Sequence, residues 1–276
     1  MVKKISVGIA AAVLAVTVGV ANADQLDDIR KKGQIVVGVL GTDEPNSFID
    51  SKTRELVGYD VDLAKAVAQK IGVTPVFKQI TVAARIPELQ QGHVDLLAAS
   101  LTHTKAREAQ LDFSLTTFVT GQTVLVKKSS GIKDVPDLAG KRVVTVKGGT
   151  QERNTKKAVP TATVVTFDTA PQAFQALQQG KAAAFVNDDK SVVRALVQLG
   201  EQGKDYQILP SNLSIEPLAL GIKKGETRLK KMVDETLLEL ETSGKAETLY
   251  EQWYGQQSAL KMPKRNFKFD SDQVTE

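Results

Sequence analysis

The chain of 276 residues contains no cysteine and only two histidines, and aromatic residues make up 5% of it. Without cysteine there is no disulfide, no thiolate nucleophile and no cysteine-based metal site. His93 and His103 lie in separate loops and are expected at the surface, so they do not form a zinc site. No Gly-x-Ser-x-Gly, His-Glu-x-x-His or P-loop motif occurs. We therefore expect no catalytic residue, metal or cofactor, and a fold held together by its hydrophobic core alone.

An excess of charge is also lacking. The formal net charge is +4, and it falls to +2 without Lys3 and Lys4. A nucleic-acid-binding surface needs clustered Lys and Arg, so we expect no nucleic-acid partner.

Residues 1–23 are organised like a secretory signal peptide. Lys3 and Lys4 precede an uncharged run from Ile5 to Val20, and Ala21-Asn22-Ala23 forms a cleavage site. The alternative is a membrane anchor, because the run approaches the minimum span of about 17 residues. We expect cleavage before Asp24 and a soluble, monomeric periplasmic protein.

Short β-rich runs alternate with helical patterns, which predicts an α/β fold with largely parallel sheets. The tetrapeptide Leu-Gln-Gln-Gly occurs twice, at 89–92 and at 177–180. Each copy ends a helical pattern and runs into an apolar strand, and the polar residues Ser100 and Asp188 lie eight residues past the two glycines. We interpret these as equivalent units of two similar lobes.

Ligands of open α/β sheets bind outside the carboxyl ends of the strands, so two facing lobes would present Ser100 and Asp188 to a shared cleft. The predicted organisation is lobe 1 at residues 24–118, lobe 2 at 119–217, a return to lobe 1 at 218–260 and a polar tail at 261–276. The hinge crossings are predicted near 119–122 and 214–217. Two helices split near Ser243-Gly244 should pack back on lobe 1.

A free amino acid is a zwitterion, so its site needs a fixed cation and a fixed anion. Arg107 is predicted one turn into a helix capped by Thr104, where its guanidinium could donate two bonds to a carboxylate with Ser100, Thr102 and the helix amides nearby. The alternative is a surface arginine paired with Glu108 or Asp112. Asp188 is the complementary anion, or else a helix N-cap, for which Asp189 is the better candidate.

A glycine-rich junction, Lys147-Gly148-Gly149-Thr150-Gln151-Glu152, links a predicted strand to a helix. Its backbone amides could receive an anion, although such a segment is more often a turn.

Over Gly33 to Tyr254 the chain resembles the periplasmic amino-acid-binding proteins of ABC uptake systems, the family 3 polar amino-acid class. The resemblance rests on the segments Leu56-Val-Gly-Tyr-Asp-Val-Asp-Leu-Ala-Lys, Ile86-Pro-Glu-Leu-Gln-Gln-Gly-His-Val-Asp, Thr104-Lys-Ala-Arg107, Leu111-Asp-Phe-Ser114 and Gly244-Lys-Ala-Glu-Thr-Leu-Tyr-Glu-Gln-Trp-Tyr-Gly255. It implies a two-lobed type II periplasmic-binding fold, a membrane ABC permease as partner and ligand delivery by hinge closure.

The resemblance also implies roles for individual residues. Arg107 would bind the α-carboxylate with Ser100, Thr102 and Thr150, and Asp188 would bind the α-ammonium. Arg85 matches the arginine that glutamate- and aspartate-binding members use for the ligand's side-chain carboxylate, and its alternative is a surface arginine at a helix start. The full expected ligand-binding set is Arg107, Asp188, Ser100, Thr102, Thr150, Arg85, Gln151 and Asn46.

The sequence departs from this family in the first loop. Glu44-Pro45-Asn46-Ser47-Phe48 replaces the aromatic-x-Pro-Phe stretch that covers the ligand, and Leu40 stands where acidic-ligand members carry a basic residue. Glutamate or aspartate is nevertheless the ligand we expect, because a second buried cation in the cleft favours an acidic side chain.

Two other classes of function use the same fold. One is a dehydratase of the cyclohexadienyl type, for which Asp188, His103 or Glu152 could serve as general acid. The other is a ligand-sensing component for chemotaxis. The main expectation is a binding protein and not an enzyme.

Overall fold

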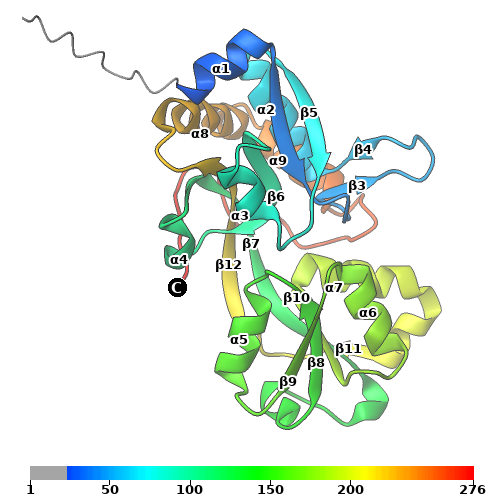
Figure 1. The fold of residues 1–276 in the computed structure, drawn as a ribbon. Helices are drawn as coiled ribbons and strands as arrows, with labels where there is room; N and C mark the ends of the chain where they lie inside the picture. Colours follow the sequence, from blue (N-terminus) through cyan, green and yellow to red (C-terminus); the bar gives the residue numbers. More distant parts are fainter. Residues whose placement is uncertain (1–23) are drawn as a thin grey trace, which may run out of the picture.

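The computed structural model describes residues 24–276, and the predicted signal peptide lies outside the described residues. Two α/β lobes are joined by two long strands (Figure 1). Strand β7 (Leu111–Lys127) runs from one lobe into the other, and β12 (Ser214–Lys223) pairs antiparallel with it along the crossing. The two segments predicted as hinge lie opposite each other, since Ser214 pairs with Gln122 and Pro217 with Val119.

Lobe 1 is built on a sheet with the strand order β5–β1–β6–β12–β7. The pairs β1–β5 and β1–β6 are parallel, whereas β12 is antiparallel to both of its neighbours. Its strands are β1 (Gln34–Val39), β5 (Thr74–Gln79) and β6 (Leu96–Thr102), with a small antiparallel sheet of β2 (Thr42–Asp43), β3 (Ser47–Ile49) and β4 (Leu56–Val57) beside it. Its helices are α1 (Gln25–Lys32), α2 (Tyr59–Ile71), α3 (Arg85–Gln90), α4 (Lys105–Glu108), α8 (Thr227–Thr242) and α9 (Lys245–Trp253).

Helix α2 shows how the sequence pattern determines local structure. Its apolar residues recur at helical spacing and are buried, among them Val61, Ala64 and Val67. The helix ends at Gly72, whose φ of 86° is left-handed and whose N–H donates to the Ala68 carbonyl. A glycine adopts this conformation without the steric cost that a Cβ would add.

Lobe 2 repeats the arrangement of lobe 1, with the strand order β9–β8–β10–β7 and β11 on the outer edge of β7. In lobe 1, β1 lies between β5 and β6, and the antiparallel strand β12 is next to β6. In lobe 2, β8 lies between β9 and β10 in the same way, and the antiparallel strand β7 is next to β10. This equivalence supports our interpretation of the repeated tetrapeptide. The elements are β8 (Arg142–Val146), β9 (Thr163–Phe167), β10 (Ala184–Asp188), β11 (Tyr206–Ile208), α5 (Gln151–Ala158), α6 (Ala170–Gln178) and α7 (Asp189–Leu199), with 3₁₀ turns at Lys128–Ser130, Val135–Leu138 and Gly200–Asp205.

The C-terminal segment differs from the expected polar tail. Phe267 and Phe269 are buried in the core of lobe 1, and Arg265 stacks over both rings with its guanidinium carbon 4.9 Å and 4.7 Å from their centroids. Further on, Thr275 exchanges two backbone hydrogen bonds with the His103–Lys105 loop. The sequence pattern concealed this packing because the two phenylalanines are isolated among charged residues.

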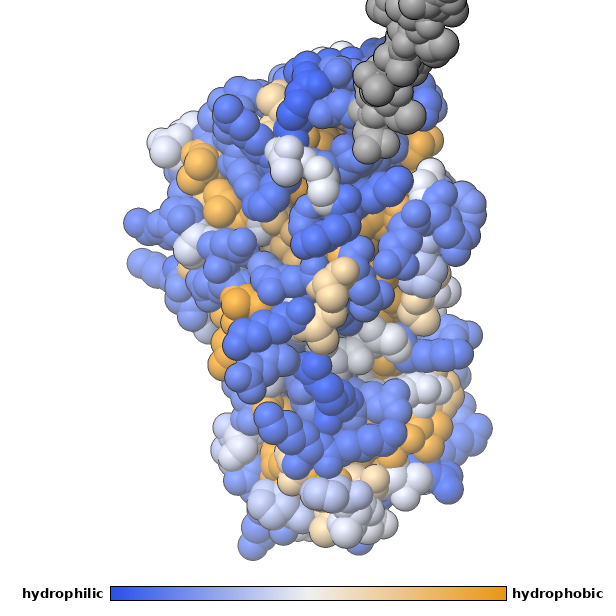
Figure 2. All heavy atoms as spheres, turned by 60° about the vertical axis from the view of Figure 1, so that its left-hand side comes forward, coloured by the Kyte–Doolittle hydropathy of each residue, from blue (hydrophilic) through white to orange (hydrophobic). Residues whose placement is uncertain are grey.

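The surface is hydrophilic over most of the face shown in Figure 2, where the apolar residues form small separate patches. Between residues 24 and 276, the structure contains no helix of the length and apolar character needed to cross a bilayer.

Candidate ligand-binding site

A cavity of about 290 Å³ lies between the two lobes, where the ends of β1, β6, β8 and β10 face each other. Lobe 1 and lobe 2 both contribute walls, as expected for a ligand site in facing α/β sheets. Six of the eight predicted ligand-binding residues line this cavity: Arg85, Ser100, Thr102, Thr150, Gln151 and Asp188. Arg107 and Asn46 are not among its lining residues.

Arg85 lies in the first turn of α3 and is only 4% exposed, so it is not a surface arginine. Its guanidinium donates to the carbonyls of Val82, Ala99 and Ser100, at 2.9, 3.0 and 2.8 Å. It also donates to the Gly148 carbonyl of lobe 2 at 3.3 Å. All four partners are neutral. Burial is the largest cause and the positive charge of Arg107 the second, and together they lower the pKa of Arg85 to about 9.

Arg107 lies in the short helix α4, where the Thr104 hydroxyl accepts a bond from its backbone N–H as predicted. Its guanidinium donates to the carbonyls of Thr102 and Gly148 at 2.9 and 3.2 Å. Together with Arg85 it lines a smaller neighbouring cavity of about 230 Å³. Neither predicted surface partner pairs with it, because Glu108 contacts His103 and Asp112 contacts Lys224. Burial lowers the pKa of Arg107 to about 10.

Ser100 occupies an irregular position in β6. Its φ is 48°, and the register between β6 and β12 shifts at this point. As a result its backbone N–H donates to Asp60 at 2.9 Å, and its hydroxyl donates to Asp43 at 2.7 Å. The bulge thus turns the backbone and the side chain of one residue toward the cavity, as bulges near binding sites often do.

Asp188 is the last residue of β10 and is 8% exposed. It stands at the N-cap position of α7, but its side chain makes no capping bond. Its carboxylate instead accepts a bond from the Gln151 amide at 2.9 Å. Burial raises the pKa of Asp188 to about 6, against the opposing effect of Lys190. Asp189 accepts bonds from the Lys190 N–H and the Thr120 hydroxyl, both at 2.6 Å.

The Thr150 hydroxyl lines the cavity but is held by the crossing strands. It accepts a bond from the Gln122 amide at 2.5 Å and donates to the buried carboxylate of Glu216 at 2.9 Å. Asn154 of α5 donates to the same Glu216 at 2.9 Å. The loop after β8 is therefore tied to the two strands that connect the lobes.

Asn46 lies behind the cavity wall. It is 1% exposed, donates to Asp43 at 2.9 Å and accepts a hydrogen bond from the Tyr254 hydroxyl. Its position supports Asp43, which itself lines the cavity.

Sequence reasoning missed four charged residues at or beside the site: Asp43, Asp60, Lys190 and Glu216. Asp60 is the second residue of α2, after the N-cap Gly58 and Tyr59, so the sequence presents it as a surface residue in a helix start. It is buried instead, and burial raises its pKa to about 6. Lys190 also lies in a helix start and is 1% exposed. The sequence pattern of a helix does not show whether the polar residues of its first turn are exposed or lie against another part of the protein.

His103 is also buried, at 2% exposure, so the expectation of a surface histidine was wrong for this residue. Its ring stacks on Phe113 with centroids 4.0 Å apart. Its two nitrogens lie 2.9 Å from carboxylate oxygens of Glu108 and Asp272. The C-terminal segment thereby holds the loop that carries Arg107. His93 is exposed, as predicted.

Two similar lobes around a cleft between strand ends define a type II periplasmic-binding fold. The chain belongs to the bacterial extracellular solute-binding proteins, family 3, which match residues 35–256. This finding confirms the fold and the family expected from the sequence.

Named relatives extend over most of the chain. The ABC transporter glutamine-binding protein GlnH of Bacillus subtilis is 33% identical over 83% of this chain and 84% of its own. The glutamate/aspartate import solute-binding protein of Salmonella typhimurium is 30% identical over 94% and 92%. Among solved structures, the ancestral amino acid-binding protein AncCDT-1, a precursor of cyclohexadienyl dehydratase, has a TM-score of 0.75 and 34% identity over 84% of this chain and 100% of its own.

Proposed function

We propose that the protein is the periplasmic binding component of an ABC amino-acid importer, acts as a monomer and takes glutamate or aspartate as its ligand. The observation that carries the proposal is the set of hydrogen-bond partners of the Arg85 and Arg107 guanidinium groups. Within residues 24–276 neither guanidinium has a carboxylate partner within 4.0 Å, and both donate to the same Gly148 carbonyl. A buried and a half-buried cation with only neutral acceptors favour a ligand that brings two carboxylates.

The opposite charge is present on the lobe 2 side of the cavity. Asp188 is the acceptor we assign to the α-ammonium group, with Gln151 holding its carboxylate. The α-carboxylate is assigned to Arg107, where it would replace the neutral carbonyl of Gly148 by a charged acceptor. The side-chain carboxylate is assigned to Arg85. This distribution places the anionic end of the ligand on lobe 1 and the cationic end on lobe 2.

Hinge closure would couple binding to delivery. The Gly148 contacts with Arg85 and Arg107 join the lobes, and so does the ion pair between Glu44 of lobe 1 and Arg194 of lobe 2. A ligand that contacts both lobes favours the conformation in which the two lobes lie close together. The closed surface is what a membrane permease would recognise.

The test is isothermal titration of refolded, ligand-stripped protein against the twenty amino acids, on wild type and on Arg107→Ala, Arg85→Ala and Arg30→Ala. We expect wild type to bind glutamate and aspartate, and Arg107→Ala to lose about 2–5 kcal/mol of binding free energy for every ligand. Arg85→Ala should weaken the two acidic ligands selectively. The exposed Arg30 of α1 is the matched control and should change nothing.

Each result bears on a different part of the proposal. Binding of another polar amino acid would keep the binding function and overturn the acidic specificity. Unchanged binding in Arg107→Ala would overturn the assignment of the α-carboxylate.

A dehydratase is the alternative, and one observation favours it: burial raises the pKa of the cavity carboxyl of Asp188 to about 6, which suits a general acid. Incubation with a prephenate-like hydroxy acid tests it. Turnover that is lost in Asp188→Asn, with no binding of any amino acid, would replace the transport function by this one.

A further inference from the structure

Lys190 is a buried cation that the binding site described above does not use. It lies in the first turn of α7 in lobe 2, and its side chain reaches across to lobe 1. The ammonium nitrogen is 5.0 Å from the ring centroid of Phe118, 3.5 Å from the Ser100 hydroxyl and 3.8 Å from the Asp188 carboxylate. Lysine is almost never fully buried unless it is paired, so a 1% exposed lysine beside a ligand cavity needs a reason.

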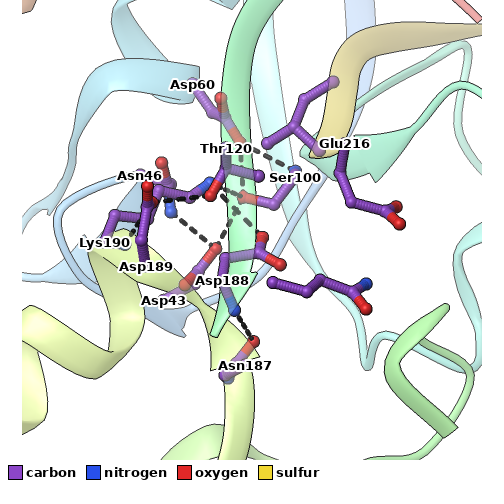
Figure 3. A network of polar contacts seen from close by, with 12 residues as sticks. Asp43, Asn46, Asp60, Ser100, Thr120, Asn187, Asp188, Asp189, Lys190 and Glu216 are labelled. Atoms are coloured by element: carbon purple, nitrogen blue, oxygen red, sulfur yellow. Dashed lines mark hydrogen bonds and ion pairs between the residues drawn. The ribbon is translucent and has the colours of Figure 1, made fainter. Parts of the chain in front are cut away.

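The surroundings of Lys190 are rich in carboxylates. Figure 3 shows Asp43, Asp60 and Asp188 gathered around Ser100 and Lys190. Asp43 and Asp60 both accept bonds from Ser100, and Asp188 forms the ion pair with Lys190. Three carboxylates and one ammonium carry a formal charge of −2. Without Lys190 the same group would carry −3 and would attract a cation in the cleft more strongly.

The electrostatics of the two aspartates agree with this arrangement. Burial raises the pKa of both Asp60 and Asp188, and Lys190 is in each case the strongest influence that lowers it again. The lysine therefore keeps these carboxylates ionised next to the cavity. The ligand's α-ammonium then meets an anionic Asp188.

We propose that Lys190 is a specificity-determining residue, which supplies a built-in cation beside the cavity and so makes the cleft reject amino acids with a positively charged side chain. The inference rests on the proposed amino-acid-binding function. It assigns the choice between acidic and basic ligands to a lobe 2 residue, in addition to the cations of lobe 1. The ammonium group of Lys190 lies over the Phe118 ring, so an uncharged side chain of similar length can fill the same space against this ring.

The experiment is titration of glutamate, glutamine and arginine into wild type, Lys190→Met and Lys190→Arg at neutral pH. In Lys190→Met we expect the ratio of arginine affinity to glutamate affinity to rise by about 30-fold or more, because one positive charge is removed within a few ångströms of the ligand. Glutamine should change least. Lys190→Arg keeps the charge and should keep the wild-type ratio.

A structural role predicts a different result. If Lys190 only held the lobes together, Lys190→Met would weaken all three ligands by the same factor, and an unchanged ratio would overturn the proposal. Asp60→Asn provides a second measurement that does not depend on the folding of Lys190→Met. It removes one negative charge from the same group, so the ratio of arginine to glutamate affinity should fall. A rise in Asp60→Asn would also overturn the proposal.

The outcomes separate this inference from the proposed function. A wild-type protein that binds none of the amino acids contradicts the function itself. A wild-type protein that binds amino acids, together with a Lys190→Met variant of unchanged ratio, contradicts only the role of Lys190.

Discussion

Strands β6 and β10 occupy equivalent places in the two lobes, yet they meet the cleft in different ways. Each is the third strand of its lobe and each follows a short helix that ends before a glycine in the left-handed region, Gly92 or Gly180. Strand β6 then bulges at Ser100, whereas β10 keeps a regular register with β7 up to its last residue, Asp188.

The bulge changes what the strand can offer to a ligand. At Ser100 the backbone itself is used, since its N–H donates to Asp60 and its carbonyl accepts from Arg85. At Asp188 the side chain accepts a bond from Gln151, and the backbone N–H donates to the side chain of Asn187 at 2.9 Å. The repeat therefore determines the position of the two polar residues, and the local backbone determines what they contact: Ser100 orders Arg85 and Asp60 through its backbone, and Asp188 presents a carboxylate to the cavity.

The largest expected effect comes from removing the anion of lobe 2. Asp188→Asn deletes the carboxylate assigned to the ligand's α-ammonium, and we expect a loss of about 2–5 kcal/mol in binding free energy. Titration calorimetry measures it. Asp168→Asn is the matched control, because Asp168 also lines the cavity but is exposed. Equal losses in the two variants would show that the cavity's overall charge, and not Asp188 itself, holds the ligand.

A smaller effect should follow from the bulge of lobe 1. Ser100 has a φ of 48°, which a β-branched residue adopts only with strain. We expect Ser100→Val to lower the free energy of unfolding by about 1–3 kcal/mol relative to Ser100→Gly, since glycine tolerates this backbone. Urea unfolding of both variants measures the difference, and both lose the same bond to Asp43. Equal stability would mean that the bulge relaxes without cost.

The comparison also shows how far the sequence determines the site. The repeated helix–glycine–strand pattern located Ser100 and Asp188 correctly at the cavity, because the turn glycines and the apolar strands are local features. The bulge was not predictable, since it depends on the pairing of β6 with β12, about 120 residues later in the chain.

Charged residues in helix first turns were the other failure. Asp60 and Lys190 have the pattern of exposed residues, but both are buried. Asp60 accepts a bond from Ser100 of β6 in its own lobe, and Lys190 reaches Ser100 from the other lobe. Arg107 was placed in the correct helix, but its guanidinium lies against Gly148, which only the approach of lobe 2 brings there. Contacts between lobes are tertiary, and no periodicity along one segment encodes them.

The smallest expected effect is the pH dependence of folding stability and of ligand affinity, which tests the role of Asp188 in lobe 2. In the ligand-free protein burial raises the pKa of Asp188 from 3.8 to about 6. The folded state therefore binds an extra proton between these values, and the stability that this proton contributes is fully present below about 3.8 and lost as pH rises through about 6. The ligand's ammonium needs the ionised carboxylate, so affinity should change the other way and fall about fivefold between pH 6 and pH 5.

Melting temperatures with and without glutamate at pH 5, 6 and 7 measure both trends in one series. The increase in melting temperature caused by the ligand should grow with pH, because the affinity for the ligand rises as Asp188 ionises. In Asp188→Asn the increase should no longer grow with pH. An increase that stays constant in wild type would place the titrating carboxyl away from the ammonium site. The anion would then have to come from a carboxylate other than Asp188 and Asp60, because burial raises the pKa of both to about 6.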